Sequence, residues 1–140
     1  MVANFISEII AEQKVYVLEY KGEVAISQSL LFKNDNNFPV DVICFWSKKT
    51  LASACCKEDW KVYKPQEVCL ATFIEDYLVQ IYNNSFIVGI DFDFEMQGVE
   101  ADPLDVLNLL INRMKAENIY LEFEYFKDLQ DLEEQLKKIL

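Results

Sequence analysis

The chain has 140 residues and a formal net charge of −11, with 24 acidic and 13 basic side chains and no histidine. Apolar residues make up 52% of it, which excludes a disordered chain and is ample for a hydrophobic core. The negative charge repels phosphate groups, so we expect neither nucleic-acid nor membrane-surface binding. A length near the modal size of one domain predicts a single domain over residues 1–140.

The sequence carries no signal for export. The N-terminal residues lack a basic stretch and a small-residue cleavage site, so no signal peptide is expected. No apolar run approaches the roughly 18 residues that a membrane span needs. The cysteines at 44, 55, 56 and 69 lack Cys-x-x-Cys spacing and are expected to be reduced and mostly buried. We therefore expect a cytoplasmic protein.

The first half of the chain predicts a helix followed by β-structure. Apolar residues recur with helical spacing in the first thirteen positions. Two alternating runs then flank Lys21-Gly22, and such runs around a glycine turn predict a β-hairpin. A polar loop closed by Pro39 leads into a continuous apolar run, which is suited to a central strand. The expected ranges are 3–13 for the helix, 15–20 and 23–27 for the hairpin, 33–37 for the loop and 40–46 for the central strand.

The second half predicts four helices and one further strand. Ser47 is placed to cap the first of these helices, and Asp102 and Asp128 are placed to cap the last two. Pro103 strengthens the start at Asp102, because proline is favoured in the first helical turn. The expected ranges are 48–56 for the first helix, 60–65 for an irregular crossing, 70–82 for the second helix, 86–92 for the strand, and helices that begin at 103 and 129.

Residues 119–126 fit two patterns. Ile119, Leu121 and Phe123 alternate as in a strand, whereas Ile119, Phe123 and Phe126 fit a helical period, and the strand is slightly favoured. The chain shows no repeat and no linker. The order of elements predicts an α+β fold, in which the hairpin and two or three further strands form a small antiparallel or mixed sheet with helices packed on one face.

The residue types needed for common catalytic sites are missing. Without histidine the chain lacks the commonest general base, the commonest zinc ligand and any Ser-His or Cys-His pair. The glycines, at 22, 89 and 98, are too few for a phosphate-binding loop, and the cysteine spacing does not resemble a zinc module. We expect no catalytic residue and no cofactor. These absences argue against an enzyme, although one catalytic or metal-binding alternative stays open.

That alternative rests on the acidic run Asp91-x-Asp93-x-Glu95. On a strand these three side chains would share one face, and carboxylate oxygens are the ligands that divalent cations such as Ca²⁺ and Mg²⁺ take. The run therefore predicts a divalent-metal-binding module or a metal-assisted enzyme. A half-buried strand with a solvated acidic face predicts the same alternation.

Trp46, Trp60 and Tyr63 are the second candidate site. Aromatic side chains near loops form ligand-stacking walls or the energetic centre of a protein interface. They also form the cores of small domains, and this is the more frequent role. Together with the acidic run, these three residues are the ones we expect at a partner or ligand surface.

Five short motifs lie in the middle of the chain: Phe45-Trp46-Ser47, Trp60 with Tyr63, Pro65 and Glu67, a helix start at 70–73, Ile87-Val88-Gly89-Ile90-Asp91, and Gly98-x-Glu100-x-x-Pro103. In combination they resemble a small bacterial family, domain of unknown function 2750, over about residues 15–110. Residues 117–140 then form a C-terminal extension. The chain departs from the family pattern at Tyr77, where tryptophan followed by Leu-Pro is expected. The resemblance implies a bacterial cytosolic protein and brings no activity or ligand.

Missing catalytic motifs, acidity and many aromatic residues predict a non-catalytic binding or accessory protein. The expected partner is a protein with a basic surface, because opposite charges steer association. An immunity- or inhibitor-like protein that covers a basic toxin or nuclease is one specific form of this hypothesis. Self-association into a homo-oligomer is a further alternative.

Overall fold

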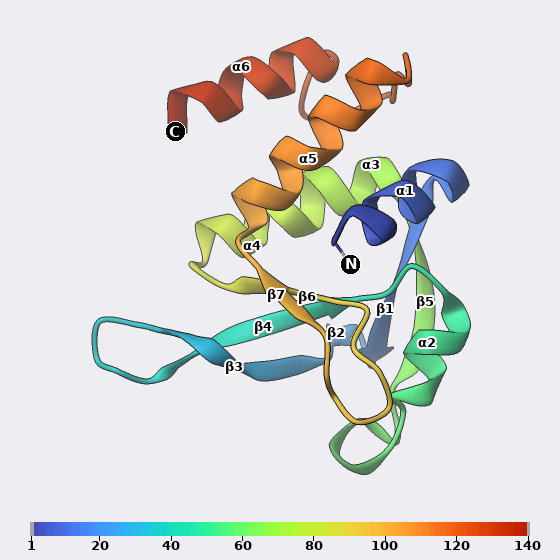
Figure 1. Ribbon diagram of the computed structural model, residues 1–140, viewed down its shortest axis with the longest axis vertical. Coiled ribbons are helices and arrows are strands. Elements are labelled where there is room, and N and C mark those ends of the chain that lie inside the picture. Colours follow the sequence, from blue (N-terminus) through green and yellow to red (C-terminus); the bar gives the residue numbers. More distant parts are fainter. Residues whose placement is uncertain (1, 140) are drawn as a thin grey trace.

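The computed structural model describes residues 2–139, which fold into two small β-sheets and a layer of helices (Figure 1). This is the α+β class that the sequence predicts. No helix within this range is both long enough and apolar enough to cross a membrane. The strands are β1 Lys14–Tyr20, β2 Glu23–Val24, β3 Ile26–Lys33, β4 Pro39–Phe45, β5 Lys64–Cys69, β6 Ile87–Ile90 and β7 Val99–Ala101. The helices are α1 Val2–Glu12, α2 Lys49–Ala54, the 3-10 turn η1 Glu58–Trp60, α3 Leu70–Thr72, the π-helical turn η2 Phe73–Leu78, α4 Val79–Asn83, α5 Pro103–Ala116 and α6 Leu129–Ile139.

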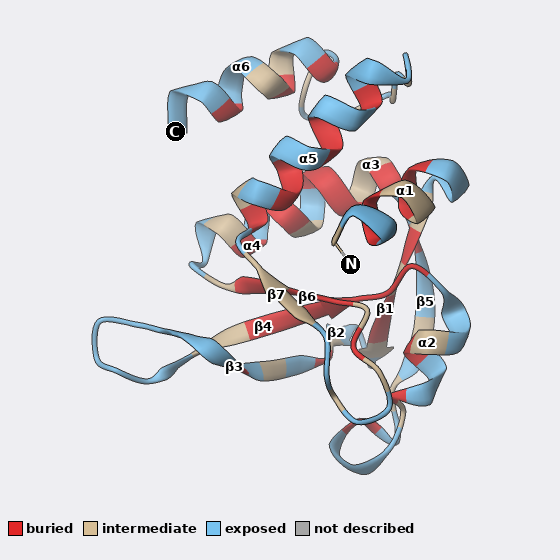
Figure 2. Cartoon of the chain, in the orientation of Figure 1, coloured by how far each residue is buried: buried red, intermediate tan, exposed pale blue. Residues whose placement is uncertain are grey.

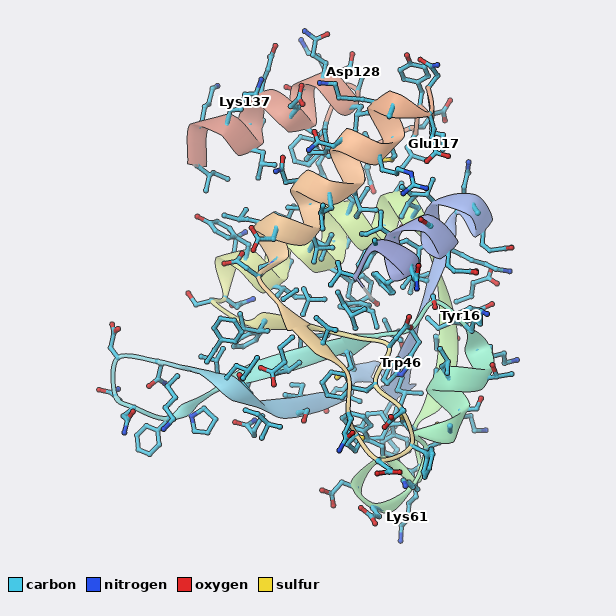
Figure 3. All side chains as sticks on the ribbon, in the orientation of Figure 1. Tyr16, Trp46, Lys61, Glu117, Asp128 and Lys137 are labelled. Carbon is cyan, nitrogen blue, oxygen red and sulfur yellow. The ribbon has the colours of Figure 1, made fainter. Side chains whose placement is uncertain are left out.

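The two sheets meet at one corner. One has the order β2-β1-β5, and the other has the order β3-β4-β6-β7, in which β4 and β6 run parallel. Tyr16 on β1 and Trp46 at the end of β4 exchange two backbone hydrogen bonds of 2.8 and 2.9 Å (Figure 3). The chain also passes from β2 to β3 at Ala25, whose N–H donates to the Leu18 carbonyl at 2.9 Å. The two sheets therefore share a buried corner.

The predicted hairpin around Lys21-Gly22 is present, but its second arm is short. Gly22 has a φ of +80°, which glycine adopts without strain. The second arm, β2, ends at Val24, since the chain then enters the other sheet as β3. A second and longer hairpin, β3–β4, encloses the polar loop. The sequence predicts only the loop and the β4 strand there.

Two further strands, β5 and β7, are missing from the sequence-based prediction. β5 pairs with β1 from Cys69 opposite Lys14 to Lys64 opposite Glu19, in the segment expected to be an irregular crossing. Pro65 is tolerated in it because β5 is the edge strand of its sheet. β7 has three residues, which are too few to show an alternating pattern.

Hydrophobic clusters occupy both faces of the four-stranded sheet β3-β4-β6-β7. Its two central strands, β4 and β6, are largely buried (Figure 2). On one face, Phe45 and Ile90 pack under α1, α5 and the α3–α4 helix. On the other face, Cys44 packs with Trp46, Trp60 and Ala52 of α2. The sequence predicts helices on one face of the sheet, whereas helical residues contribute to the clusters on both faces. A Cβ atom on Gly89 would lie 2.8 Å from the Cys44 Sγ atom, which shows how closely this second cluster fills the space.

Two of the three predicted helix caps are confirmed. The Asp102 carboxylate accepts from the Leu104 N–H and the Asp128 carboxylate accepts from the Asp131 N–H, both at 2.8 Å. Ser47, however, does not cap α2, which covers 49–54 instead of 48–56 and begins without a side-chain cap. Its hydroxyl instead donates to the Asp91 carboxylate.

Residues 119–126 form neither the strand that was slightly favoured nor a helix. The Glu75 side chain in the π-helical turn is buried, and its two carboxylate oxygens accept from the Glu124 N–H at 3.0 Å and the Tyr125 N–H at 2.7 Å. Apolar side chains of this segment, Phe123 among them, pack partly against the helical core. Because a distant carboxylate takes up these N–H groups, the alternating segment needs no partner strand.

Candidate interaction surface

The β3–β4 hairpin projects from the body of the protein and is exposed along its tip (Figures 1 and 2). Leu30 is 88% exposed, Leu31 73% and Phe38 65%, with Phe32 beside them at 38%. Proteins that act alone seldom leave several large apolar side chains together in water. We call these four residues the hairpin patch.

A glutamate from the far edge of the sheet holds the start of this patch in place. The Ser29 hydroxyl donates to one carboxylate oxygen of Glu100 on β7, and the Leu30 N–H donates to the other at 2.9 Å. The Ser29 oxygen in turn accepts from the N–H groups of Leu31 and Phe32 at 3.1 and 2.7 Å. Three consecutive N–H groups are thus satisfied where the register of β3 and β4 shifts. The irregularity turns Leu30 and Leu31 toward solvent.

A groove runs along β3 from the hairpin patch toward the η1 turn. It consists of two adjoining hollows of about 330 and 410 Å³, which share Ser27, Gln28 and Met96. Glu58 and Asp59 line the end beyond the patch together with one basic residue, Lys57, so the acids are in excess there. The surface beside the hairpin patch is therefore partly apolar and partly acidic.

The predicted aromatic site belongs to the core. Trp46 is fully buried and Trp60 is 7% exposed, and their rings pack edge to face with centroids 6.3 Å apart. The Trp46 Nε1–H donates to the Phe92 carbonyl at 2.8 Å. Tyr63 is half-buried and packs against Tyr20. Trp46 therefore belongs to the buried aromatic cluster, whereas Trp60 also lines the 330 Å³ hollow, and the predicted role of these residues at a partner or ligand surface stays a prediction.

The metal hypothesis requires the acidic run to lie on a strand, but it does not. β6 ends before Asp91, and the three acids follow in a loop. Asp91 accepts from Ser47, whereas Asp93 accepts from the N–H groups of Glu95 and Gln97 at 2.9 and 3.1 Å and so closes a turn. Within residues 2–139, no three acids or cysteines come together in a group that could hold a metal ion. The three side chains would share one face only on a strand, and β6 ends before the first of them.

All four cysteines are free thiols, but only two of them are fully buried. Burial raises the pKa of Cys44 and Cys55, and the Cys55 thiol donates to the Phe92 and Asp93 carbonyls at 3.3 and 3.2 Å. Cys56 is half-buried. Cys69 is exposed and is the one cysteine that clearly departs from the expected burial. A buried thiol with a raised pKa is a poor nucleophile, because the reactive species is the thiolate.

A family model described as a protein of unknown function, DUF2750, matches residues 2–110. The chain belongs to this family. The DUF2750 match begins earlier than the resemblance in the motifs and leaves out the end of α5, the segment 117–128 and α6. Neither the curated proteins nor the solved structures contain a match to the chain.

Residues that carry the resemblance to DUF2750 build the surroundings of the hairpin patch. Glu100 is the residue that binds Ser29. Gly98 comes two residues before it, where a Cβ atom would lie 2.7 Å from the Ile90 carbonyl oxygen. Only glycine fits this close approach of two backbone segments. The sequence shows Gly98 and Glu100 as motif positions but does not reveal their role, because Ser29 and the exposed leucines show no pattern of their own.

Proposed function

We propose that this DUF2750 protein is a non-catalytic binding or accessory protein that docks a protein partner through the hairpin patch. The observation that carries the proposal is the exposure of Leu30 and Leu31 on a hairpin whose shape is fixed from below by Glu100. A fixed apolar patch loses little conformational entropy on binding, and this favours its use as a docking element.

The partner we propose has an apolar patch surrounded by basic residues. The chain carries a net charge of −11, and Glu58 and Asp59 line the groove beside the patch. Opposite charge on the partner would speed up the encounter and fix its orientation. A second copy of the chain brings the same negative charge, so we favour a different protein over a homo-oligomer. An immunity- or inhibitor-like role against a basic toxin or nuclease is the specific form of this proposal.

We place this activity in the cytoplasm. The four cysteines within residues 2–139 are free thiols. Free thiols persist in the reducing cytoplasm and are oxidised in exported proteins.

The test is capture of the partner from bacterial lysate with tagged protein, washed over a salt series and compared between variants. Wild-type protein should retain one stoichiometric partner that moderate salt releases. The double variant Leu30→Ser, Leu31→Ser should lose it, and Tyr120→Ser, which changes another highly exposed side chain far along the chain, should keep it.

Equal capture by the double variant and the wild type would contradict the proposal. So would a concentration-dependent dimer in analytical ultracentrifugation that the double variant abolishes, since the occupant of the patch would then be a second copy of the chain.

A further inference from the structure

A second hollow, separate from the hairpin patch, lies where the two parallel strands end. Within residues 2–139, β4 and β6 are the only parallel neighbours. Beyond β4 the chain continues through Ser47 into α2, and beyond β6 it continues through Asp91 toward β7. Where parallel strands end and their continuations diverge, a crevice opens that ligands occupy in many α/β proteins.

The hollow has a volume of about 410 Å³, and its lining combines polar and charged side chains from three segments with apolar surface that includes Leu51. α1 contributes Ser7 and Glu8, the start of α2 contributes Lys48 and Thr50, and the strand ends contribute Ser47 and Asp91. Its size suits a small molecule, and its lining offers both charges together with several hydroxyl groups.

Asp91 is held rigidly at this hollow and keeps capacity to bind. Its N–H donates to the Phe45 carbonyl at 2.9 Å, and one carboxylate oxygen accepts from the Ser47 N–H at 2.8 Å. The Ser47 hydroxyl lies 3.1 and 3.0 Å from the two carboxylate oxygens, but its single hydrogen can serve only one of them at a time. Since a carboxylate accepts about four hydrogen bonds, the half-buried Asp91 retains free acceptor sites.

The charged side chains around the hollow form no ion pair among the described residues. The ion pairs there join other residues, and none includes Glu8, Lys48 or Asp91. Two half-buried carboxylates without a protein cation favour a cationic group, and an exposed lysine at the rim favours an anionic one. A metal ion does not fit, because the described acids do not gather in threes.

We propose that this hollow binds a small zwitterionic amine of the α-amino-acid type. Its ammonium group lies on the Glu8 and Asp91 side and its carboxylate faces Lys48, while the serine and threonine hydroxyls contact the remaining polar atoms. The site shares no residue with the hairpin patch, so it stands or falls independently of the proposed partner binding.

The first experiment is a thermal-shift screen of the wild-type protein with glycine and the L-forms of the other protein amino acids, each at 10 mM or, for tyrosine, at saturation, followed by calorimetric titration of the best one. An amino acid present at about 100 times its Kd should raise Tm by roughly 5 °C or more. Acetate and methylammonium, which each carry only one of the two charges, should bind at least tenfold more weakly.

Variants then locate the site. Lys48→Ala and Glu8→Gln change side chains at the rim that make no ion pair, and each should weaken binding at least tenfold. Lys49→Ala and Glu12→Gln remove the same kinds of charge from neighbouring positions outside the hollow and should leave binding unchanged. The proposal is overturned if no amino acid shifts Tm in this screen, if Lys48→Ala and Glu8→Gln bind like the wild type, or if acetate or methylammonium binds as tightly as the amino acid.

Discussion

Glu100 on β7 and Ser29 on β3 are joined by a side-chain hydrogen bond although 71 residues separate them. Their strands are at opposite edges of a four-stranded sheet. The Glu100 side chain nevertheless reaches β3, so the two edge strands approach each other at this point. The same carboxylate also accepts from the Leu30 N–H, so one residue anchors the start of the hairpin patch to the opposite edge strand.

Replacing this glutamate should loosen the hairpin without unfolding the protein. In Glu100→Ala, Ser29 and the Leu30 N–H lose their charged acceptor, and we expect the free energy of unfolding to fall by about 1–3 kcal/mol. Urea denaturation measures this loss, and amide hydrogen exchange should show faster exchange at residues 30–32. Glu95→Ala, which changes an exposed acid whose side chain accepts no hydrogen bond in the fold, is the control. A loss of stability without faster exchange at 30–32 would contradict the assigned role.

Trp46 should be far more important for stability than for binding. Trp46→Phe removes the Nε1–H bond to Phe92 and part of the edge-to-face packing on Trp60, and leaves a cavity in a fully buried site. We expect it to cost about 2–4 kcal/mol. Chemical denaturation followed by circular dichroism measures the loss, with Tyr120→Phe as a surface control that should stay within about 0.5 kcal/mol of the wild type. A cost as small as that of the control would rule out the buried role.

The buried Glu75 should hold the segment 119–126 against the helical layer. Glu75→Gln replaces one acceptor oxygen by an NH₂ group that faces a backbone N–H, at an expected cost of about 1–3 kcal/mol. Limited proteolysis should then cut the variant within 119–126 faster than the wild type. Asp76→Asn, at the exposed neighbouring position, should be cut at the wild-type rate. Equal rates for both variants would show that apolar packing alone holds the segment.

The four thiols should differ widely in reactivity. Cys69 is exposed and should react first with a thiol reagent at pH 8, followed by the half-buried Cys56. Cys44 and Cys55 are buried and their pKa values are raised, so they should react only when the protein unfolds. Mass spectrometry of the modified protein gives the order, and Cys69→Ser should remove the fast phase. Early modification of Cys44 in the folded protein would contradict this order.

Stability should fall in alkaline solution. Burial raises the pKa of Cys44, Cys55 and Cys56 above the ordinary value of 9.0, so the folded chain keeps thiol protons that the unfolded chain releases. This contribution is complete below pH 9 and is lost as pH rises toward the raised pKa values. Urea denaturation at pH 7.5, 9 and 10 should show the decline, and Cys44→Ala should make it shallower. A slope that is the same in the variant would assign the decline to other groups.

Helix positions could be predicted from the sequence because their signals are local. Asp102 and Pro103 mark the start of α5, and the carboxylate of Asp102 bonds an N–H only two residues away. The β5 strand could not be predicted in the same way. Its residues show no regular alternation of apolar and polar side chains, and it becomes a strand because β1 offers a partner along its whole length.

The candidate site residues show the same difference between local signals and tertiary contacts. The spacing of Asp91, Asp93 and Glu95 implies a shared face only if the backbone is extended. The chain instead turns at Asp91, where φ is +49°, because Ser47 binds its carboxylate from the end of the neighbouring strand. The sequence groups Trp46 with Trp60, but their burial follows from the tertiary structure, in which Trp60 on the η1 turn packs with Trp46 and with residues of the α2 region.

The sequence by itself determined the α+β class, the long helices, the turn at Gly22 and the acidic charge, because each depends on composition or on residues a few positions apart. Only the tertiary structure decided which side chains remain exposed on β3 and which acids are occupied. The bonds responsible link Ser29 to Glu100, Ser47 to Asp91 and Glu75 to Glu124, across 71, 44 and 49 residues. No local pattern encodes a hydrogen bond over such separations, since it forms only when packing has brought the two segments together.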